Sequence, residues 1–273
     1  MNDNISEKTK KIQWTAGSRL LKKNYESLRT VLYYKMLSLR LLILHTMNDS
    51  LMVSQLSEIE KAEFYRKTYM HVAVAILAFG AVEYLLLKTV PLETVLTMVS
   101  GRYIWLAVIG VFWLASMLAT KLSFSLSRNT QYLGLGLYVL IEAVIFLPML
   151  GIASLYAPQV ITQAALVTLF MFAGLTATVF FTNKDFSFLR NIIVIGGFVA
   201  LGVIVAGSIF GWNLGLWFSL AMVGLASASI LYETYNIKNV YNKEQYVGAA
   251  LQMFASIMLL FWYILRIFLN RRD

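Results

Sequence analysis

Seven runs of apolar residues, each close to the length that crosses a membrane, follow one another along the chain with short polar stretches between them. A helix needs about 20 apolar residues to cross the hydrocarbon core, and within lipid a run of that length satisfies its backbone polar groups by forming a helix. The pattern predicts spans near Tyr69–Leu87, Tyr103–Leu122, Tyr132–Leu150, Ile161–Thr182, Asn191–Phe210, Leu214–Tyr235 and Tyr246–Phe268. We therefore expect an all-α integral membrane protein, a bundle of seven transmembrane helices.

Composition agrees with this pattern. Of the 273 residues, 59% are hydrophobic and 14% are charged, whereas a soluble domain has about 45–50% apolar and about 25% charged residues. The net charge of +9 comes from Lys and Arg gathered in the N-terminal region and in short loops. That distribution is typical of a membrane protein in a lipid bilayer and does not indicate a nucleic-acid partner.

Several kinds of chemistry are excluded by the residue types present. The chain has no cysteine, so disulfides and thiolate metal sites are absent. Its two histidines, His45 and His71, stand on opposite sides of a predicted segment boundary, which disfavours a zinc site. The serines of the late spans have no histidine in the same helices to act as a base. We expect neither an enzyme nor a cofactor.

The first part of the chain differs from the rest. We divide the sequence into a basic cytoplasmic segment, residues 1–62, and a membrane domain, residues 63–273. The apolar stretch Met36–Leu44 in the first segment is too short to span. It could lie on the cytoplasmic leaflet as an amphipathic segment. Two other interpretations are that the segment is poorly ordered, or that translation begins at Met47 or Met52.

The orientation follows from the distribution of Lys and Arg, which favour the cytoplasmic side. With the N-terminus inside, eighteen of the 23 basic residues lie inside and five lie outside. We therefore expect a multi-pass protein of the inner (cytoplasmic) membrane with a cytoplasmic N-terminus. Seven spans would place the tail Asn270–Asp273 outside, unless the tail is tolerated there or the last helix re-enters the membrane.

Three acidic residues fall inside predicted spans: Glu83 in the first, Glu142 in the third and Glu233 in the sixth. A carboxylate at membrane depth is costly and is retained mainly where it faces a bundle interior or water. The three could form an acidic ladder for protons or for calcium, which prefers oxygen ligands, with Glu233 and Glu142 as the candidate calcium ligands. Such a path would respond to pH. Alternatively, Glu83 snorkels to the interface and Glu142 hydrogen-bonds to a neighbouring helix.

Six short stretches are distinctive: Phe64–Tyr69, Asp185–Leu189, Ile230–Ile237, Gln245–Val247, Ala249–Leu251 and Leu260–Arg266. Together they resemble the Bax inhibitor-1 family, in particular its bacterial branch and the transmembrane Bax inhibitor motif proteins. The likeness covers about Glu63 to Arg272.

The resemblance implies a seven-helix bundle with one central helix that acts as a pH-sensitive calcium leak. It also implies a gate of two facing aspartates on the last two spans. Here the first position is Glu233 and the second is Ser256. Since a serine hydroxyl cannot share a proton as a carboxyl does, the paired gate does not carry over intact. The nearest match to the family's gate-partnering arginine is Arg128.

Two functions from different classes remain open. The first is a calcium or cation leak, with Glu233 as the inner gate, Glu142 in mid-membrane, and Ser256 and Glu83 on the path. The second is a regulator without transport, whose basic N-terminal segment binds a membrane protease or another quality-control partner. A cavity shared by Glu233 and Glu142 would favour the leak.

Overall fold

The computed structural model describes residues 35–37, 51–91, 93–95, 97, 102–212 and 214–270, without the side chains of 102–106. The chain divides into two units, Met1–Leu51 and Met52–Asp273. In the first unit only a short helical piece at residues 35–37 and Leu51 are described. The expected basic segment, including most of Met36–Leu44, therefore lies largely outside the described residues.

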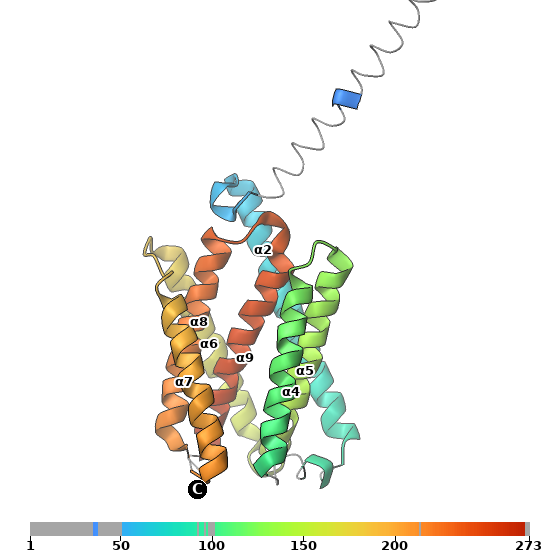
Figure 1. Ribbon diagram of the computed structural model, residues 1–273, viewed down its shortest axis with the longest axis vertical. Coiled ribbons are helices and arrows are strands. Elements are labelled where there is room, and N and C mark those ends of the chain that lie inside the picture. Colours follow the sequence, from blue (N-terminus) through green and yellow to red (C-terminus); the bar gives the residue numbers. More distant parts are fainter. Residues whose placement is uncertain are drawn as a thin grey trace, which may run out of the picture. The chain divides into compact units, whose positions relative to one another are not determined.

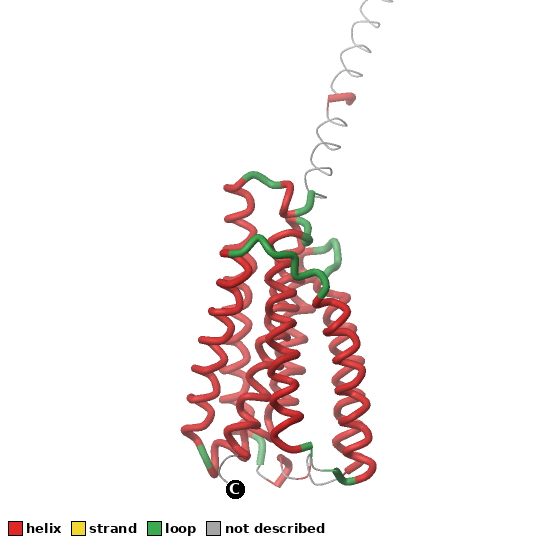
Figure 2. The backbone as a smooth tube through the Cα atoms, turned by 90° about the vertical axis from the view of Figure 1, so that its left-hand side faces the viewer, coloured by secondary structure: helices red, strands yellow, loops and turns green. Residues whose placement is uncertain are grey.

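The second unit is an all-helical bundle, in agreement with the expected fold class (Figures 1 and 2). Its elements are η1 (Val53–Gln55), α2 (Glu58–Thr89), α4 (Arg102–Ser123), α5 (Arg128–Tyr156), α6 (Pro158–Phe181), α7 (Leu189–Phe210), α8 (Gly215–Asn239), η2 (Lys243–Gln245) and α9 (Tyr246–Asn270). The end of the bundle that carries η1 and η2 is called the η end below.

Six of these helices are long and apolar enough to cross a membrane: α2, α5, α6, α7, α8 and the α9 segment. In α4 the corresponding apolar stretch, Ala107–Ser123, is shorter. The protein is therefore a multi-pass helical membrane protein with six candidate spans among the described residues. The seventh crossing stays a prediction.

Helix α9 forms the centre of the bundle (Figure 1). It packs against α2, α4, α5, α6 and α8, and most of its residues are buried. Aromatic rings join it to its neighbours: Phe254 contacts Phe79 of α2 and Tyr138 of α5, with ring centroids 6.4 and 6.1 Å apart. Such edge-to-face pairs add to the burial of apolar area and fix the three helices against one another.

Local sequence explains where the helices begin and end. Ser57 accepts a hydrogen bond from the Glu60 amide, and the Glu60 carboxylate accepts one in return from the Ser57 amide, which is a capping box at the start of α2. Pro158 stands at the first turn of α6, where its missing N–H is not needed. Gly211 ends α7 with φ of 73°, a left-handed conformation that glycine adopts without strain.

The stretch Asp185–Leu189 forms the turn that leads into α7. The Asp185 carboxylate accepts a hydrogen bond from the Ser187 amide at 2.7 Å, and the Leu189 amide donates to the Phe186 carbonyl. The Ser187 amide lowers the pKa of Asp185. This family-like motif therefore has a local structural role as a helix-initiating turn.

Candidate functional site

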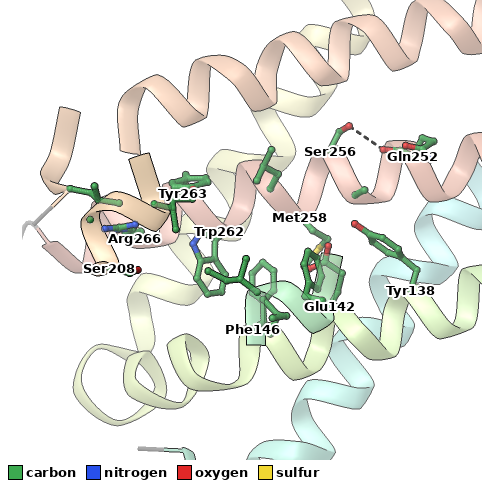
Figure 3. Close-up of a pocket in the computed structure, with 18 of the residues that line it drawn as sticks. Tyr138, Glu142, Phe146, Ser208, Gln252, Ser256, Met258, Trp262, Tyr263 and Arg266 are labelled. Atoms are coloured by element: carbon green, nitrogen blue, oxygen red, sulfur yellow. Dashed lines mark hydrogen bonds between the residues drawn. The ribbon is translucent and has the colours of Figure 1, made fainter. Parts of the chain in front are cut away.

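A cavity of about 610 Å³ lies within the bundle and is lined by α4, α5, α7 and α9 together with the α7–α8 connection (Figure 3). Its walls are mainly aliphatic and aromatic. The lining side chains that carry a hydroxyl, carboxyl, amide or guanidinium group are Tyr138, Glu142, Ser208, Gln252, Ser256, Tyr263 and Arg266. Two of the four sequence-predicted site residues, Glu142 and Ser256, thus line one cavity.

Glu142 brings the only carboxyl group to this cavity among the described lining residues. It lies about 21 Å along α5 from the η end, at 1.5 Å per residue, and its side chain is 5% exposed. Tyr138 lies one turn earlier on α5 and is also buried. Phe146, one turn later, packs edge-to-face against Trp262 with centroids 4.9 Å apart. The i, i+4 spacing places Tyr138, Glu142 and Phe146 on one face of α5.

Ser256 contributes the α9 wall of the same cavity, and 7% of the residue is exposed. Its hydroxyl donates to the Gln252 carbonyl one turn earlier, at 3.0 Å (Figure 3). The hydroxyl is therefore bonded to its own helix and does not bridge to Glu233. The expected pairing of two gate residues across the last two helices is not formed by these two side chains.

Glu233 lies outside the cavity, on α8, about 9 Å from the η end at 1.5 Å per residue. Its carboxylate accepts a hydrogen bond from the Tyr241 hydroxyl at 2.7 Å and a longer one from the Asn236 amide at 3.4 Å. The side chain is partly buried. Tyr241 is therefore the hydrogen-bonding partner of Glu233, where the family resemblance implies a second acid.

Tyr241 is itself held firmly at the η end. Its carbonyl accepts a hydrogen bond from the Val53 amide of η1 at 2.8 Å, and its ring stacks on Phe124 with centroids 5.9 Å apart. Burial, with the Glu233 carboxylate as a second cause, raises the pKa of the Tyr241 phenol well above its usual value of 10.0. Tyr241 therefore remains a hydrogen-bond donor at any physiological pH.

Glu83 is also buried, but elsewhere. The residue is 4% exposed, it does not line the cavity, and neither carboxylate oxygen has a hydrogen-bond partner among the described residues. The side chain is thus enclosed by protein in this structure. The structure does not bring Glu83 together with Glu142 or Glu233.

A cluster of charged and aromatic side chains closes the η end between α2, α5 and α9. Arg128 forms an ion pair with Glu244, donates to the Gln131 side chain at 2.7 Å, and lies over the Tyr246 ring at 4.3 Å. His71 stacks on Tyr132 with centroids 5.6 Å apart. Arg128, the candidate gate arginine, therefore pairs with Glu244 and not with Glu233.

No metal centre is preformed in the part of the chain that the structure describes. There, no group of three or more His, Asp or Glu side chains could hold a metal ion. Glu233 and Glu142, the candidate calcium ligands, do not line a common cavity. Their depths differ by about 12 Å, at 1.5 Å per residue.

Sequence reasoning missed three residues of this site. Tyr138 was hidden within an apolar run, although its i, i+4 spacing from Glu142 was a usable signal. Tyr241 lies in the polar hairpin between the last two spans, where nothing in the pattern indicates that it turns back to Glu233. Arg266 was counted only toward membrane orientation, but it lines the cavity.

Comparison with known proteins agrees with the family resemblance. Residues 61–273 match the family model described as "Inhibitor of apoptosis-promoting Bax1". The chain is 32% identical over 208 residues to the uncharacterized protein PA2604 of Pseudomonas aeruginosa, covering 74% of this chain and 87% of that protein. It is 28% identical over 165 residues to protein lifeguard 4 of Mus musculus, covering 59% of this chain and 67% of that protein. The chain therefore belongs to the Bax inhibitor-1 family.

Proposed function

We propose that this protein is a cation leak of the inner membrane, with calcium as the expected ion, and that the bundle described here is its closed form. The observation that carries the proposal is a carboxyl group, Glu142, lining a cavity at mid-membrane depth. Ionisable side chains at that depth commonly mark ion or proton pathways. No catalytic step is assigned to the protein.

The proposed path enters the cavity at the Arg266 end, passes Glu142 and Ser256, and continues along α8 and α9 toward Glu233. Between the cavity and the η end, Ile230 of α8 and Leu251 of α9 are fully buried, and we propose that they form the closed part of the path. The bond from Tyr241 holds the Glu233 carboxylate at the η end of this closed stretch. Opening would require this bond to break and the α8–α9 contact to loosen.

The proposal places the η end, and with it the N-terminus, in the cytoplasm. It also makes α4 a seventh span. Since the structure has no preformed cluster of calcium ligands in its described part, we propose that cations pass Glu142 without being held tightly. Protons would compete for the same carboxyl group, which would make the leak sensitive to pH.

The test is calcium flux into proteoliposomes containing the purified full-length protein. We expect Glu142→Gln to lower the flux about ten-fold, the factor that corresponds to losing about 1.4 kcal/mol of stabilisation at the barrier. Glu63→Gln is the matched control, because Glu63 is paired with Lys67 on the surface of α2 far from the cavity. Equal flux in the wild type and Glu142→Gln would refute the proposal.

The alternative, a regulator that binds a membrane protease, rests on the basic segment of residues 1–62, most of which lies outside the described residues. It predicts that deleting residues 1–48 abolishes co-purification with the protease and leaves the flux unchanged. Loss of flux in Glu142→Gln together with unchanged co-purification would separate the two functions.

A further inference from the structure

The lining of the Glu142 cavity combines one acidic group with many aromatic rings. Six aromatic side chains face it: Phe112, Tyr138, Phe146, Trp212, Trp262 and Tyr263. Its volume of about 610 Å³ lies within the range of sites that hold drug-sized molecules, about 300–1,000 Å³. Such sites have mainly apolar walls and a few polar groups that select the ligand, which is the composition found here.

Three of these aromatic rings lie close to the Glu142 carboxyl group. Tyr138 and Phe146 flank Glu142 one turn away on either side of it along α5, and Trp262 packs on Phe146. The faces of aromatic rings attract cations, and the attraction is strongest where water is excluded. A cation beside Glu142 would therefore be bound by a carboxylate and by ring faces at the same time.

The one basic side chain among the described lining residues, Arg266, lies at the far end of the cavity from Glu142 and Tyr138 (Figure 3). Glu142 lies one turn before Phe146 on α5, and Phe146 packs on Trp262, which lies one turn before Arg266 on α9. The Glu142 and Arg266 positions are therefore about 12 Å apart along the bundle, at 1.5 Å per residue. Coulomb energy falls with distance, so attraction to a carboxylate at about 4 Å exceeds repulsion from a charge at about 12 Å by about three-fold. The Glu142 end of the cavity is therefore selective for positive charge.

We propose that this cavity is a binding site for lipophilic organic cations, with the positive centre beside Glu142 and the apolar groups against the aromatic walls. A small hydrated ion gains little from such walls, whereas a cation that carries its own apolar surface buries that surface on binding. The inference concerns the same cavity as the proposed leak, but it does not depend on conduction.

The test uses two probes of the same shape and opposite charge, tetraphenylphosphonium and tetraphenylborate. Binding of each is measured by equilibrium dialysis against the purified full-length protein in detergent, with empty micelles as the blank. We expect saturable binding of one tetraphenylphosphonium per chain and no saturable binding of tetraphenylborate. Equal saturable binding of both probes, or preference for the borate, would overturn the proposal.

Two variants separate the role of charge from that of space. Glu142→Gln is expected to weaken tetraphenylphosphonium binding about ten-fold. Ala255→Trp keeps the acid but fills the cavity from α9, where Ala255 lines it, and is expected to abolish binding. Glu63→Gln is expected to bind as the wild type does. Undiminished binding by a folded Ala255→Trp would refute the site even if Glu142→Gln did not fold.

The two proposals can fail separately. Binding of tetraphenylphosphonium in a protein that passes no calcium would support the site and refute the leak. Calcium flux that depends on Glu142, in a protein that does not bind the probe, would support the leak and refute the site.

Discussion

Glu233 stands at the first gate position that the family resemblance implies, but its partner differs from the implied one. The family resemblance suggested an acid on the last helix as its partner, and Ser256 occupies that position. The structure instead gives Glu233 a phenol, Tyr241, from the connection between α8 and α9. A hydrogen bond to a charged group contributes about 1.5 to 3 kcal/mol, so this single contact is large enough to bias a gate.

Replacing Tyr241 by Phe tests this role. The substitution removes the hydroxyl that donates to Glu233 and keeps the ring that stacks on Phe124. We expect calcium flux in proteoliposomes to rise by about 10- to 150-fold, because the bond proposed to hold the gate closed contributes about 1.5 to 3 kcal/mol. Tyr156→Phe, at an exposed residue at the end of α5, is the control. Flux unchanged by Tyr241→Phe would show that this bond is no gate.

The same contact makes a prediction about pH. The pKa of Tyr241 is raised in the folded protein, so the stability that its proton provides is fully present below the usual pKa of 10.0. That stability is lost only as the pH rises through the raised value. The ratio of flux in Tyr241→Phe to flux in the wild type should therefore stay constant between about pH 6 and 9. A ratio that changed steadily over this range would show that the Tyr241–Glu233 bond itself depends on pH, and would contradict this prediction.

At the scale of helices, the contact between α4 and α5 depends on Gly134. A Cβ atom there would lie 2.6 Å from both the Ala119 carbonyl oxygen and the Ser123 amide nitrogen, which are backbone atoms of α4. Small residues allow this kind of close approach between membrane helices. A methyl group at this position would force the two helices apart.

We expect Gly134→Ala to destabilise the protein by about 1–3 kcal/mol, the usual cost of overpacking. Gly136→Ala, two residues later, is the matched variant, because a Cβ there has nothing within 4 Å. It should be neutral or stabilising by up to about 1 kcal/mol, since alanine favours helix. Thermal unfolding in detergent measures both. Equal effects of the two substitutions would contradict the close contact.

These glycines also show what the sequence could and could not predict. Runs of about 20 apolar residues predicted the six helices that are candidate spans among the described residues, because length and hydropathy alone decide that a membrane segment is helical. The same pattern could not tell Gly134 from Gly136, since their difference depends on which face of α5 meets α4. For the same reason it could not tell that Glu142 lines a cavity while Glu83 does not.

For the molecule as a whole, the proposed function depends on how many helices cross the membrane and on which side of it each loop lies. The apolar part of α4 is short, yet the orientation expected from Lys and Arg requires that it cross. If α4 crosses, the α4–α5 loop lies on the same side as the start of α2. If it does not, the two lie on opposite sides.

Because the chain has no cysteine, single cysteines can be introduced and reacted with a membrane-impermeant maleimide. The reaction shows directly on which side of the membrane each site lies. Three highly exposed residues serve as sites: Ile59 at the start of α2 (83% exposed), Leu126 between α4 and α5 (106%), and Tyr156 at the end of α5 (80%). We expect cysteines at Ile59 and Leu126 to react only from the cytoplasmic side, and a cysteine at Tyr156 only from the outside. Ile59 and Leu126 reacting from opposite sides would contradict seven crossings.

The central claim is that cations pass through the cavity that Glu142 and Ser256 line. The most direct measurement is calcium flux through Ser256→Cys before and after reaction with a small, positively charged thiol reagent, with the unmodified wild type, which has no cysteine, as the control. The account predicts that reaction blocks the flux of Ser256→Cys and leaves the wild type unaffected. Complete reaction of the cysteine with no change in flux would contradict it.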